Sequence, residues 1–278
     1  GPQVVSARTG RNVTAEDLGG AKKLVASGAA QIAVASEDEA FAMARRVLSF
    51  LPDNNQEDAQ LVSADDLNRQ LDIDTYYDAH DIVARIADFN DYVELTRDFA
   101  PNMVTALARL GGRSVGIVAN NPAEHNGVLC ASACKKAARF IRLCDCYSLP
   151  VVSLINSKGV AVPAVDEQAA TIKATTQLLY AYAEATTAKV SIVTGNAIGQ
   201  AYVAMGGKSN ADVTYAWPGA VISALTPEAA VQVLYTDDLK ADKKPALQSR
   251  AELEAKFAAD VADGVAAAAA GMVDDVID

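Results

Sequence analysis

The stretch that decides the fold is Gly112-Arg113-Ser114-Val115-Gly116-Ile117-Val118-Ala119-Asn120-Asn121-Pro122, followed after a short gap by Gly127-Val128-Leu129. Its apolar centre, Val115–Ala119, predicts a strand that ends in a tight, polar, glycine-containing loop before the next helix. In an open α/β sheet, ligands bind where strands end in this way. We therefore place a candidate site at this strand end.

Strands and helices alternate on both sides of this stretch. Val151–Ile155 is a continuous apolar run of the kind that is buried on both faces of a sheet. Other predicted strands are 92–95, 190–193, 213–215 and 221–224, and predicted helices cover 132–147, 167–185 and the residues after Pro227. This alternation is typical of an α/β domain with largely parallel strands.

Further elements are expected toward the ends of the chain. Short strands are predicted at Val4–Ala7, Ile32–Ala35 and 272–277, and helices after Thr14, after Ser36, within 78–95 ahead of the strand at 92–95, over 99–110 and over 250–270. Ser36 with Glu39 has the spacing of a capping box, which satisfies free N–H groups at a helix start. The polar stretch that begins at Asp53 is the best linker, so the predicted division is 1–52, 53–77 and 78–278.

The composition of the chain argues against some classes of function. The 278 residues are 51% hydrophobic and carry a net charge of −11. An acidic chain argues against a nucleic-acid partner, because phosphate binding needs a basic surface. No apolar run reaches the roughly 18 residues that span a membrane, and the N-terminus lacks the pattern of a signal peptide. A cytoplasmic location is the expectation.

The inventory of reactive side chains is small. The four cysteines, Cys130, Cys134, Cys144 and Cys146, do not have the spacing of common zinc sites and are expected to be buried thiols. The chain has only two histidines, at positions 80 and 125. A catalytic triad or a histidine-rich metal site is therefore not expected.

Three glycine-bearing strand ends are the candidate binding elements: Asn120–Gly127, Asn156–Val160 with Gly159, and Gly195–Tyr202 with Gly199. The third has the clearest chemistry, because free N–H groups at the start of the following helix can hold an anion or a developing oxyanion. Alternatively, Gly199 only makes room for packing of the helix on the strand. In the second loop, Lys158 either contacts a carboxylate or phosphate or is a solvated loop lysine.

Several segments, in order along nearly the whole chain, resemble one known family. They are Gly1-Pro2-Gln3-Val4-Val5, Asp17-Leu18-Gly19-Gly20-Ala21, Phe99-Ala100, Arg113–Asn120, Lys136–Asp145, Tyr180–Thr186, Ala216-Trp217-Pro218 and Val273–Asp278. The chain is similar to the C-terminal half of the carboxyltransferase subunits of biotin-dependent acyl-CoA carboxylases and decarboxylases, of the propionyl-CoA, methylmalonyl-CoA and glutaconyl-CoA types.

The resemblance implies a crotonase-like (ClpP/crotonase) α/β fold built as a β-β-α spiral. Residues 1–52 would end the N-terminal carboxyltransferase domain, 53–77 would be a linker, and 78–278 would form the C-terminal domain. The implied reaction moves a carboxyl group between carboxybiotin and an acyl-CoA. The implied partners are a separate biotin carrier protein, the missing N-terminal half or partner chain, further copies of this chain, and possible membrane pump subunits.

The resemblance also assigns roles to residues. The catalytic residues would be Gly199, Gln200 and Ala201, with the N–H groups of the last two as the oxyanion hole for biotin. Asn120, Gly127 and Gly159 would line the cofactor side, and no metal is implied. Backbone donors of this kind need neither a triad nor a metal.

Two departures from the family pattern leave the substrate open. Gln200 stands where the family has glycine, and Asn156–Val160 retains only Gly159 of an Asp-x-Pro-Gly-Phe loop. No Ala-Met-Lys-Met biotin attachment motif occurs.

Two alternative functions remain. One is a non-catalytic scaffolding subunit of such a complex. The other is a biotin-independent crotonase-type hydratase or isomerase, which needs a well-placed acid or base.

Overall fold

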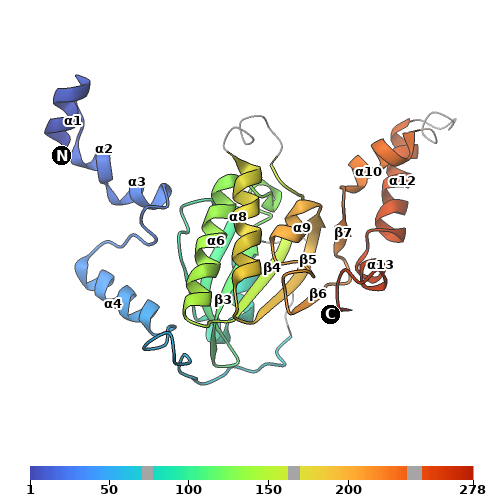
Figure 1. Cartoon of the computed structure of the whole chain (residues 1–278), viewed down its shortest axis with the longest axis horizontal. Helices are drawn as coiled ribbons and strands as arrows, with labels where there is room; N and C mark the ends of the chain where they lie inside the picture. Colours follow the sequence, from blue (N-terminus) through green and yellow to red (C-terminus); the bar gives the residue numbers. More distant parts are fainter. Residues whose placement is uncertain (71–77, 162–169, 237–245, 278) are drawn as a thin grey trace.

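The computed structural model describes residues 1–70, 78–161, 170–236 and 246–277, and its centre is one sheet (Figure 1). Within these residues the strand order is β1-β2-β3-β4-β5-β6-β8, and β7 pairs with the end of β5. The first three strands are antiparallel, whereas β3 to β6 are parallel. The strands are β1 Tyr92–Glu94, β2 Met103–Leu110, β3 Arg113–Asn120, β4 Val151–Ser157, β5 Lys189–Ile198, β6 Val213–Ala216, β7 Val221–Ser223 and β8 Asp275–Val276.

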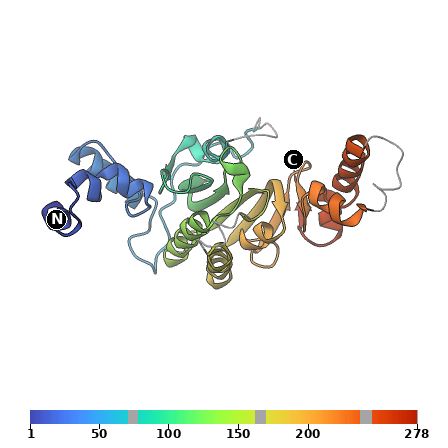
Figure 2. The same ribbon diagram turned by 90° about the horizontal axis from the view of Figure 1, so that it is seen from above.

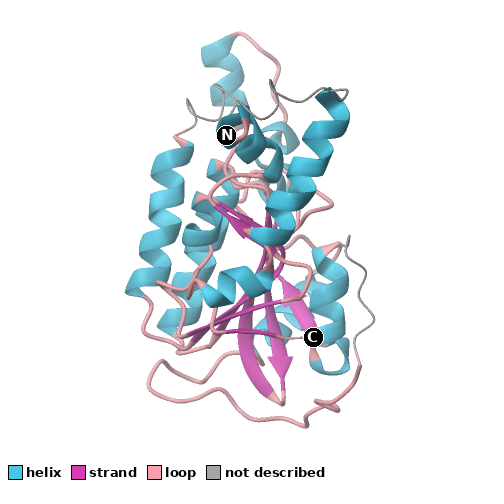
Figure 3. Cartoon of the chain, turned by 90° about the vertical axis from the view of Figure 1, so that its right-hand side faces the viewer, coloured by secondary structure: helices cyan, strands magenta, loops and turns pink. Residues whose placement is uncertain are grey.

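Helices cover both faces of this sheet (Figure 3). Helices α6 (Ala131–Cys146) and α8 (Thr171–Glu184) lie side by side on one face, and α5 (Ala79–Ile86) packs on β2 and β3 from the other. Consecutive residues of β3 divide between the two layers: Val118 belongs to the core under α6, and Ile117 to the core under α5. Burial on both sides explains why this strand is a continuous apolar run.

Two helical segments extend from the central body in opposite directions (Figures 1 and 2). The N-terminal arm, residues 1–52, contains α1 (Pro2–Thr9), α2 (Ala15–Gly19), α3 (Ala21–Ala26) and α4 (Glu37–Leu48). The C-terminal segment contains α10 (Pro227–Leu234), α12 (Ala246–Asp260) and α13 (Gly264–Ala269). It is tied to the body by an ion pair between Lys208 and Asp274 and by the pairing of β8 with β6.

Four expected elements differ in the structure. Residues 99–110 were expected to be helical, but Met103–Leu110 is β2, because all eight of these residues pair with β3. Val4–Ala7 lies inside helix α1, and Ile32–Ala35 is not a strand. The expected helix over 250–270 is two helices, because the Asp263 carboxylate accepts a hydrogen bond from Ala266 N (2.6 Å) and starts α13 anew.

The other predicted elements agree closely with the structure. The side chains of Thr14 and Ser36 both accept hydrogen bonds as N-caps at the starts of α2 and α4. The capping box predicted for Ser36 is only half formed, because the Glu39 carboxylate accepts from Ala35 N. The predicted start of the helix over 167–185 lies outside the described residues, and its described part is α8. No helix in the described part of the chain is long and apolar enough to cross a membrane.

The segment expected to be a linker is fastened to the body in its described part, 53–70. Val62 N donates to the carbonyl oxygen of Gly112 (3.0 Å). The Arg69 guanidinium donates to the carbonyl oxygens of Arg85, Ile86 and Ala87 at the end of α5. These are the carbonyls that lack partners within a helix, so Arg69 caps α5. The division into 1–52, 53–77 and 78–278 itself stays a prediction.

Candidate functional site

Three asparagines connect the ends of the parallel strands β3, β4 and β5. Asn156 N donates to the side-chain oxygen of Asn120 (3.3 Å), and Asn196 N donates to the side-chain oxygen of Asn156 (2.9 Å). Asn120 and Asn156 are buried. Because each amide oxygen accepts from the backbone of the next strand, the three loops that follow these strands are held in one register.

The loop after β3 packs directly on this row of asparagines. Asn120 Nδ2 donates to the carbonyl oxygen of Gly127 (3.3 Å). Gly127 has φ +64°, and a Cβ there would overlap the carbonyl oxygen of Asn156. A side chain at this position would therefore be strained by the backbone and blocked by β4.

Replacing Gly127 by alanine is expected to lower the free energy of unfolding by about 2–4 kcal/mol, from left-handed backbone strain and overpacking together. Urea unfolding followed by far-UV circular dichroism measures this. Gly219→Ala is the matched control, since Gly219 has open space around it and no positive φ. Equal stability of the two variants would contradict the packing described for Gly127.

Gly159 belongs to the same cluster. Its carbonyl oxygen accepts hydrogen bonds from Leu129 N (2.9 Å) and from the Ser157 hydroxyl (3.0 Å). Its φ is +123°, and a Cβ there would meet nothing within 4 Å. The structure therefore brings Asn120, Gly127 and Gly159 together at the carboxyl ends of β3 and β4, with Gly159 facing open space.

Gly199 ends β5 and starts α9 (Gln200–Ala204). Its φ of 56° and ψ of −130° suit glycine alone, and a Cβ would lie 2.9 Å from the carbonyl oxygen of Ala224. Gly199 N donates to the carbonyl oxygen of Ser223 (2.8 Å). The glycine thus allows the residue after β7 to pass closely, which is a different contact from the packing of helix on strand that was one of the two predicted alternatives.

The residues after Gly199 present free donors. Gln200 and Ala201 are the first two residues of α9, so their N–H groups have no acceptor within the helix. The Gln200 side chain is exposed, whereas Ala201 is fully buried. Asn196 lies three residues before Gly199 and belongs to the row of asparagines. The start of α9 is therefore anchored to the same cluster as Asn120 and Gly127.

Lys158 lies at the rim of this cluster and is exposed. The backbone at the start of α10 holds the pKa of Glu228 below its ordinary range, and the Thr226 hydroxyl and the charge of Lys158 act in the same direction. A lysine in the loop after β4 and a glutamate in the first turn of α10 are therefore close enough for their charges to interact. His125 is exposed on the first of these loops.

The four cysteines belong neither to the row of asparagines nor to α9. Burial raises the pKa of Cys134 to about 11 and that of Cys144 to about 12, so both are neutral thiols at physiological pH. The expectation of burial holds for these two and is wrong for Cys146, which is exposed, and for Cys130, which is half-buried. Among the described residues, no group of three metal-binding side chains forms a metal site.

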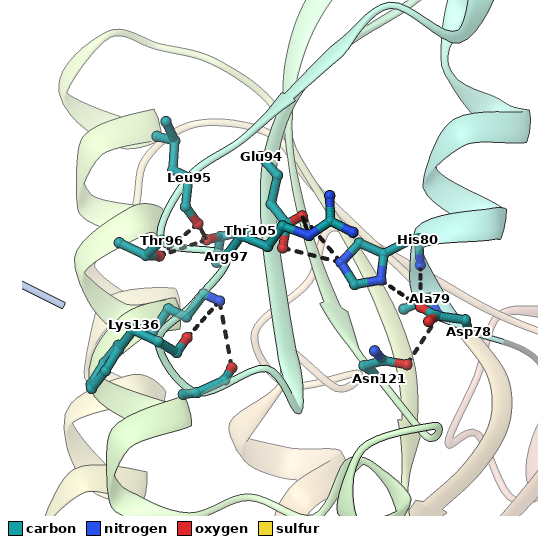
Figure 4. A network of polar contacts seen from close by, with 12 residues as sticks. Asp78, Ala79, His80, Glu94, Leu95, Thr96, Arg97, Thr105, Asn121 and Lys136 are labelled. Carbon is teal, nitrogen blue, oxygen red and sulfur yellow. Dashed lines mark hydrogen bonds and ion pairs between the residues drawn. The ribbon is translucent and has the colours of Figure 1, made fainter. Parts of the chain in front are cut away.

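A second polar cluster surrounds His80 and was not predicted from the sequence (Figure 4). His80 Nδ1 contacts Asp78 Oδ1 (2.5 Å), and Nε2 contacts Glu94 Oε2 (3.1 Å). Arg97 also pairs with Glu94 (3.6 Å), and the Asn121 side chain accepts a hydrogen bond from the first N–H of α5 (3.1 Å). The ring joins the start of α5 to β1, and no serine or cysteine lies among these partners to act as a nucleophile.

This cluster predicts a pH dependence of stability. Hydrogen bonding to Glu94 raises the pKa of His80, Asp78 acts in the same direction, and burial opposes both. The folded state therefore holds the proton more tightly. Protonated His80 therefore stabilises the fold fully below the ordinary histidine pKa of about 6.5. This stabilisation is lost as the pH rises through the raised pKa of His80 in the folded state.

We expect His80→Gln to lower the free energy of unfolding by about 1.5 kcal/mol near pH 6 and by less near pH 9. His125→Gln, at an exposed position, should change neither value. Denaturant unfolding at several pH values measures both variants. A loss that does not vary with pH would show that the charge of His80 does not contribute.

Comparison with known proteins agrees with this architecture. All of residues 1–278 match the model of the carboxyl transferase domain family. The chain is 39% identical to the methylmalonyl-CoA carboxyltransferase 12S subunit of Propionibacterium freudenreichii subsp. shermanii, covering 100% of the chain and 55% of that protein. It is 38% identical to the methylmalonyl-CoA decarboxylase subunit alpha of Propionigenium modestum, covering 100% of the chain and 56% of that protein.

A solved structure gives the same result for the fold. The crystal structure of transcarboxylase 12S, described as a hexamer with methylmalonyl-coenzyme A and methylmalonic acid bound, superposes with a TM-score of 0.92 at 39% identity, over 100% of this chain and 55% of that one. The predicted crotonase-like carboxyltransferase fold is confirmed. The chain spans about half the length of the relatives that it matches. It belongs to the carboxyl transferase domain family.

Proposed function

We propose that this chain is the biotin-side part of an acyl-CoA carboxyltransferase, which moves a carboxyl group between biotin and the carbon next to an acyl-CoA thioester. The observation that carries the proposal is the start of α9, where two N–H groups without helical acceptors follow a glycine at a strand end. Relatives that match the whole chain are named as methylmalonyl-CoA carboxyltransferase and as propionyl-CoA carboxylase carboxyltransferase subunits. The reaction class is that of these relatives, and the two N–H groups at the start of α9 support the choice of site.

The chemistry needs donors for negative charge, and this site offers them. When carboxyl transfer leaves charge on the ureido oxygen of biotin, the N–H groups of Gln200 and Ala201 stabilise it. Gly199 provides the turn at which β5 ends and α9 begins. When bound, biotin without its carboxyl group would supply the base for the substrate proton, so the protein need not supply a histidine base.

Asn120, Gly127 and Gly159 form the wall beside these donors in this proposal. Gly159 faces open space, and Gly127 lets the loop after β3 lie against β4. Asn156 acts through the others as a positioning residue, since its side chain holds Asn196 at 2.9 Å and lies against Gly195. A single misplaced loop in such an arrangement is enough to move the donors by the fraction of an ångström that matters in catalysis.

The partners follow from the same proposal. Biotin is carried by a separate protein, and the remaining half of the enzyme binds most of the acyl-CoA. The transcarboxylase 12S relative is described as a hexamer and as a multienzyme core. We propose that this chain also works in an oligomer with its missing half, and that a cytoplasmic complex, in some cases with membrane pump subunits, is its setting.

The test is the release of carbon dioxide from methylmalonyl-CoA and malonyl-CoA by the native assembly that contains the full chain. The proposal predicts release that requires added biotin. Release of equal size without biotin would contradict the proposed role of the α9 donors. Hydration of an enoyl-CoA in the absence of biotin would favour a hydratase instead.

A further inference from the structure

A cavity of about 440 Å³ lies between the N-terminal arm and the side of α6, and the proposed function does not use it. The arm contributes Ser27, Gly28 and Gln31, and the loop after β1 contributes Leu95, Thr96 and Phe99. The remaining wall consists of Thr105, Lys135, Lys136, Arg139, Phe140, Arg142 and Leu143. A volume of this order is that of a small-molecule site.

The arm is fixed over this cavity by two contacts. The carbonyl oxygen of Gln31 accepts a hydrogen bond from Thr96 N (2.8 Å). Gly28 has φ +74° and lies so close to Phe99 that a Cβ would come within 2.9 Å of the ring. Because both contacts join the arm to the loop after β1, the cavity is part of the folded structure and not a gap beside it.

The charge of the cavity wall is opposite to that of the protein. Among the residues that the structure describes, its lining includes four cations and no aspartate or glutamate, although the chain carries a net charge of −11. Lys135 and Arg139 are four residues apart and thus on one face of α6, and both are exposed. Arg142 has a long ion pair with Glu184 (3.7 Å), with both side chains more than half exposed, and such pairs are weak.

Lys136 places a further cation at the inner wall (Figure 4). Its side chain is 5% exposed, and Nζ donates to the carbonyl oxygens of Phe99 (2.9 Å) and Ala100 (3.4 Å). Burial lowers the pKa of Lys136 to about 8, against the attraction of Glu94 and Asp98. An anion in the cavity would stabilise the charged form of this lysine.

We propose that this cavity binds a small organic phosphate, with Arg139 and Lys135 as its phosphate ligands and Phe99 and Phe140 against its organic part. Arginine matches the geometry of phosphate with two parallel hydrogen bonds. The aromatic and aliphatic side chains of the wall suit a ligand that is more than inorganic phosphate. The cavity is separate from the proposed catalytic site, because none of these residues belongs to the row of asparagines or to α9.

Two ligands are organic phosphates of this kind: a free nucleotide, and the nucleotide end of coenzyme A. Isothermal titration of the full chain with ADP and with coenzyme A distinguishes them. If coenzyme A binds and ADP competes with it, the site takes the nucleotide end of the coenzyme. If ADP binds and coenzyme A does not, the ligand is a free nucleotide. Either outcome supports the site, and binding of neither probe at millimolar concentration would overturn it.

Variants locate the binding. Arg139→Gln and Lys135→Gln should each weaken ADP binding about tenfold or more, the cost of one charge-assisted hydrogen bond. Both side chains are exposed, so the fold should not depend on them. Arg45→Gln and Lys173→Gln, at exposed positions away from the cavity, are matched controls and should bind as the native chain does. Unchanged affinity in both cavity variants would refute the assignment.

Discussion

Gln200→Pro is expected to lower the rate of biotin-dependent carboxyl transfer by about 100- to 1000-fold, the usual effect of removing one donor from an oxyanion hole. The substitution removes the N–H of the first residue of α9. Proline is well tolerated at that position of a helix, and the side chain that it replaces is exposed. The helix should therefore remain while the donor is lost.

Gln200→Ala is the matched control, since it removes the same side chain and keeps the N–H. Its rate should remain within about threefold of the native rate if the backbone alone acts, well below the loss for a missing donor. Ala201→Pro tests the second donor but is less clean, because Ala201 is fully buried and the larger ring must displace its neighbours. Equal rates for Gln200→Pro and Gln200→Ala in folded protein would remove Gln200 from the site.

Phe50→Ala is expected to lower the free energy of unfolding by about 3–5 kcal/mol, as for other buried aromatic side chains. Phe50 is fully buried where the N-terminal arm meets the body, and the Arg109 guanidinium lies 4.3 Å from the centre of its ring. Arg109 also pairs with Asp91 (2.6 Å), which in turn pairs with Arg46 of α4 (3.1 Å). The Phe50 ring therefore packs in the core and also contacts the Arg109 guanidinium, which is linked to Arg46 through Asp91.

The control for this prediction is Phe41→Ala on α4, because Phe41 is 61% exposed. It removes the same ring from a solvated position and should cost less than about 1 kcal/mol. Urea unfolding monitored by circular dichroism measures both variants. If Phe41→Ala were as destabilising as Phe50→Ala, the exposed face of α4 would be covered by something else in solution.

The parallel core of the fold was predictable from the sequence because its strands are buried on both faces. Val115–Ala119 and Val151–Ile155 are apolar runs too short for helices and bounded by glycine or proline, and they became β3 and β4. Strand β2 was not predictable in the same way. Its sequence, Met103–Leu110, is rich in residues that favour helices, and its state is decided by pairing with β3.

The candidate site was predictable as a set of strand ends but not as a network. Glycines 127, 159 and 199 do lie where parallel strands end, and that much follows from topology. Asn156 was missed as a positioning residue, although an asparagine near the end of each of three consecutive parallel strands was a usable signal. The cluster at His80 was not visible, because Glu94 is fourteen residues away in the chain.

The most direct test of carboxyl transfer follows the carboxyl group itself. Methylmalonyl-CoA labelled in its free carboxyl group is given, with biotin, to the native assembly that contains this chain. The account predicts that label appears in biotin in step with the formation of propionyl-CoA, and that Gln200→Pro suppresses both. Propionyl-CoA formed at the native rate without label in biotin would contradict it.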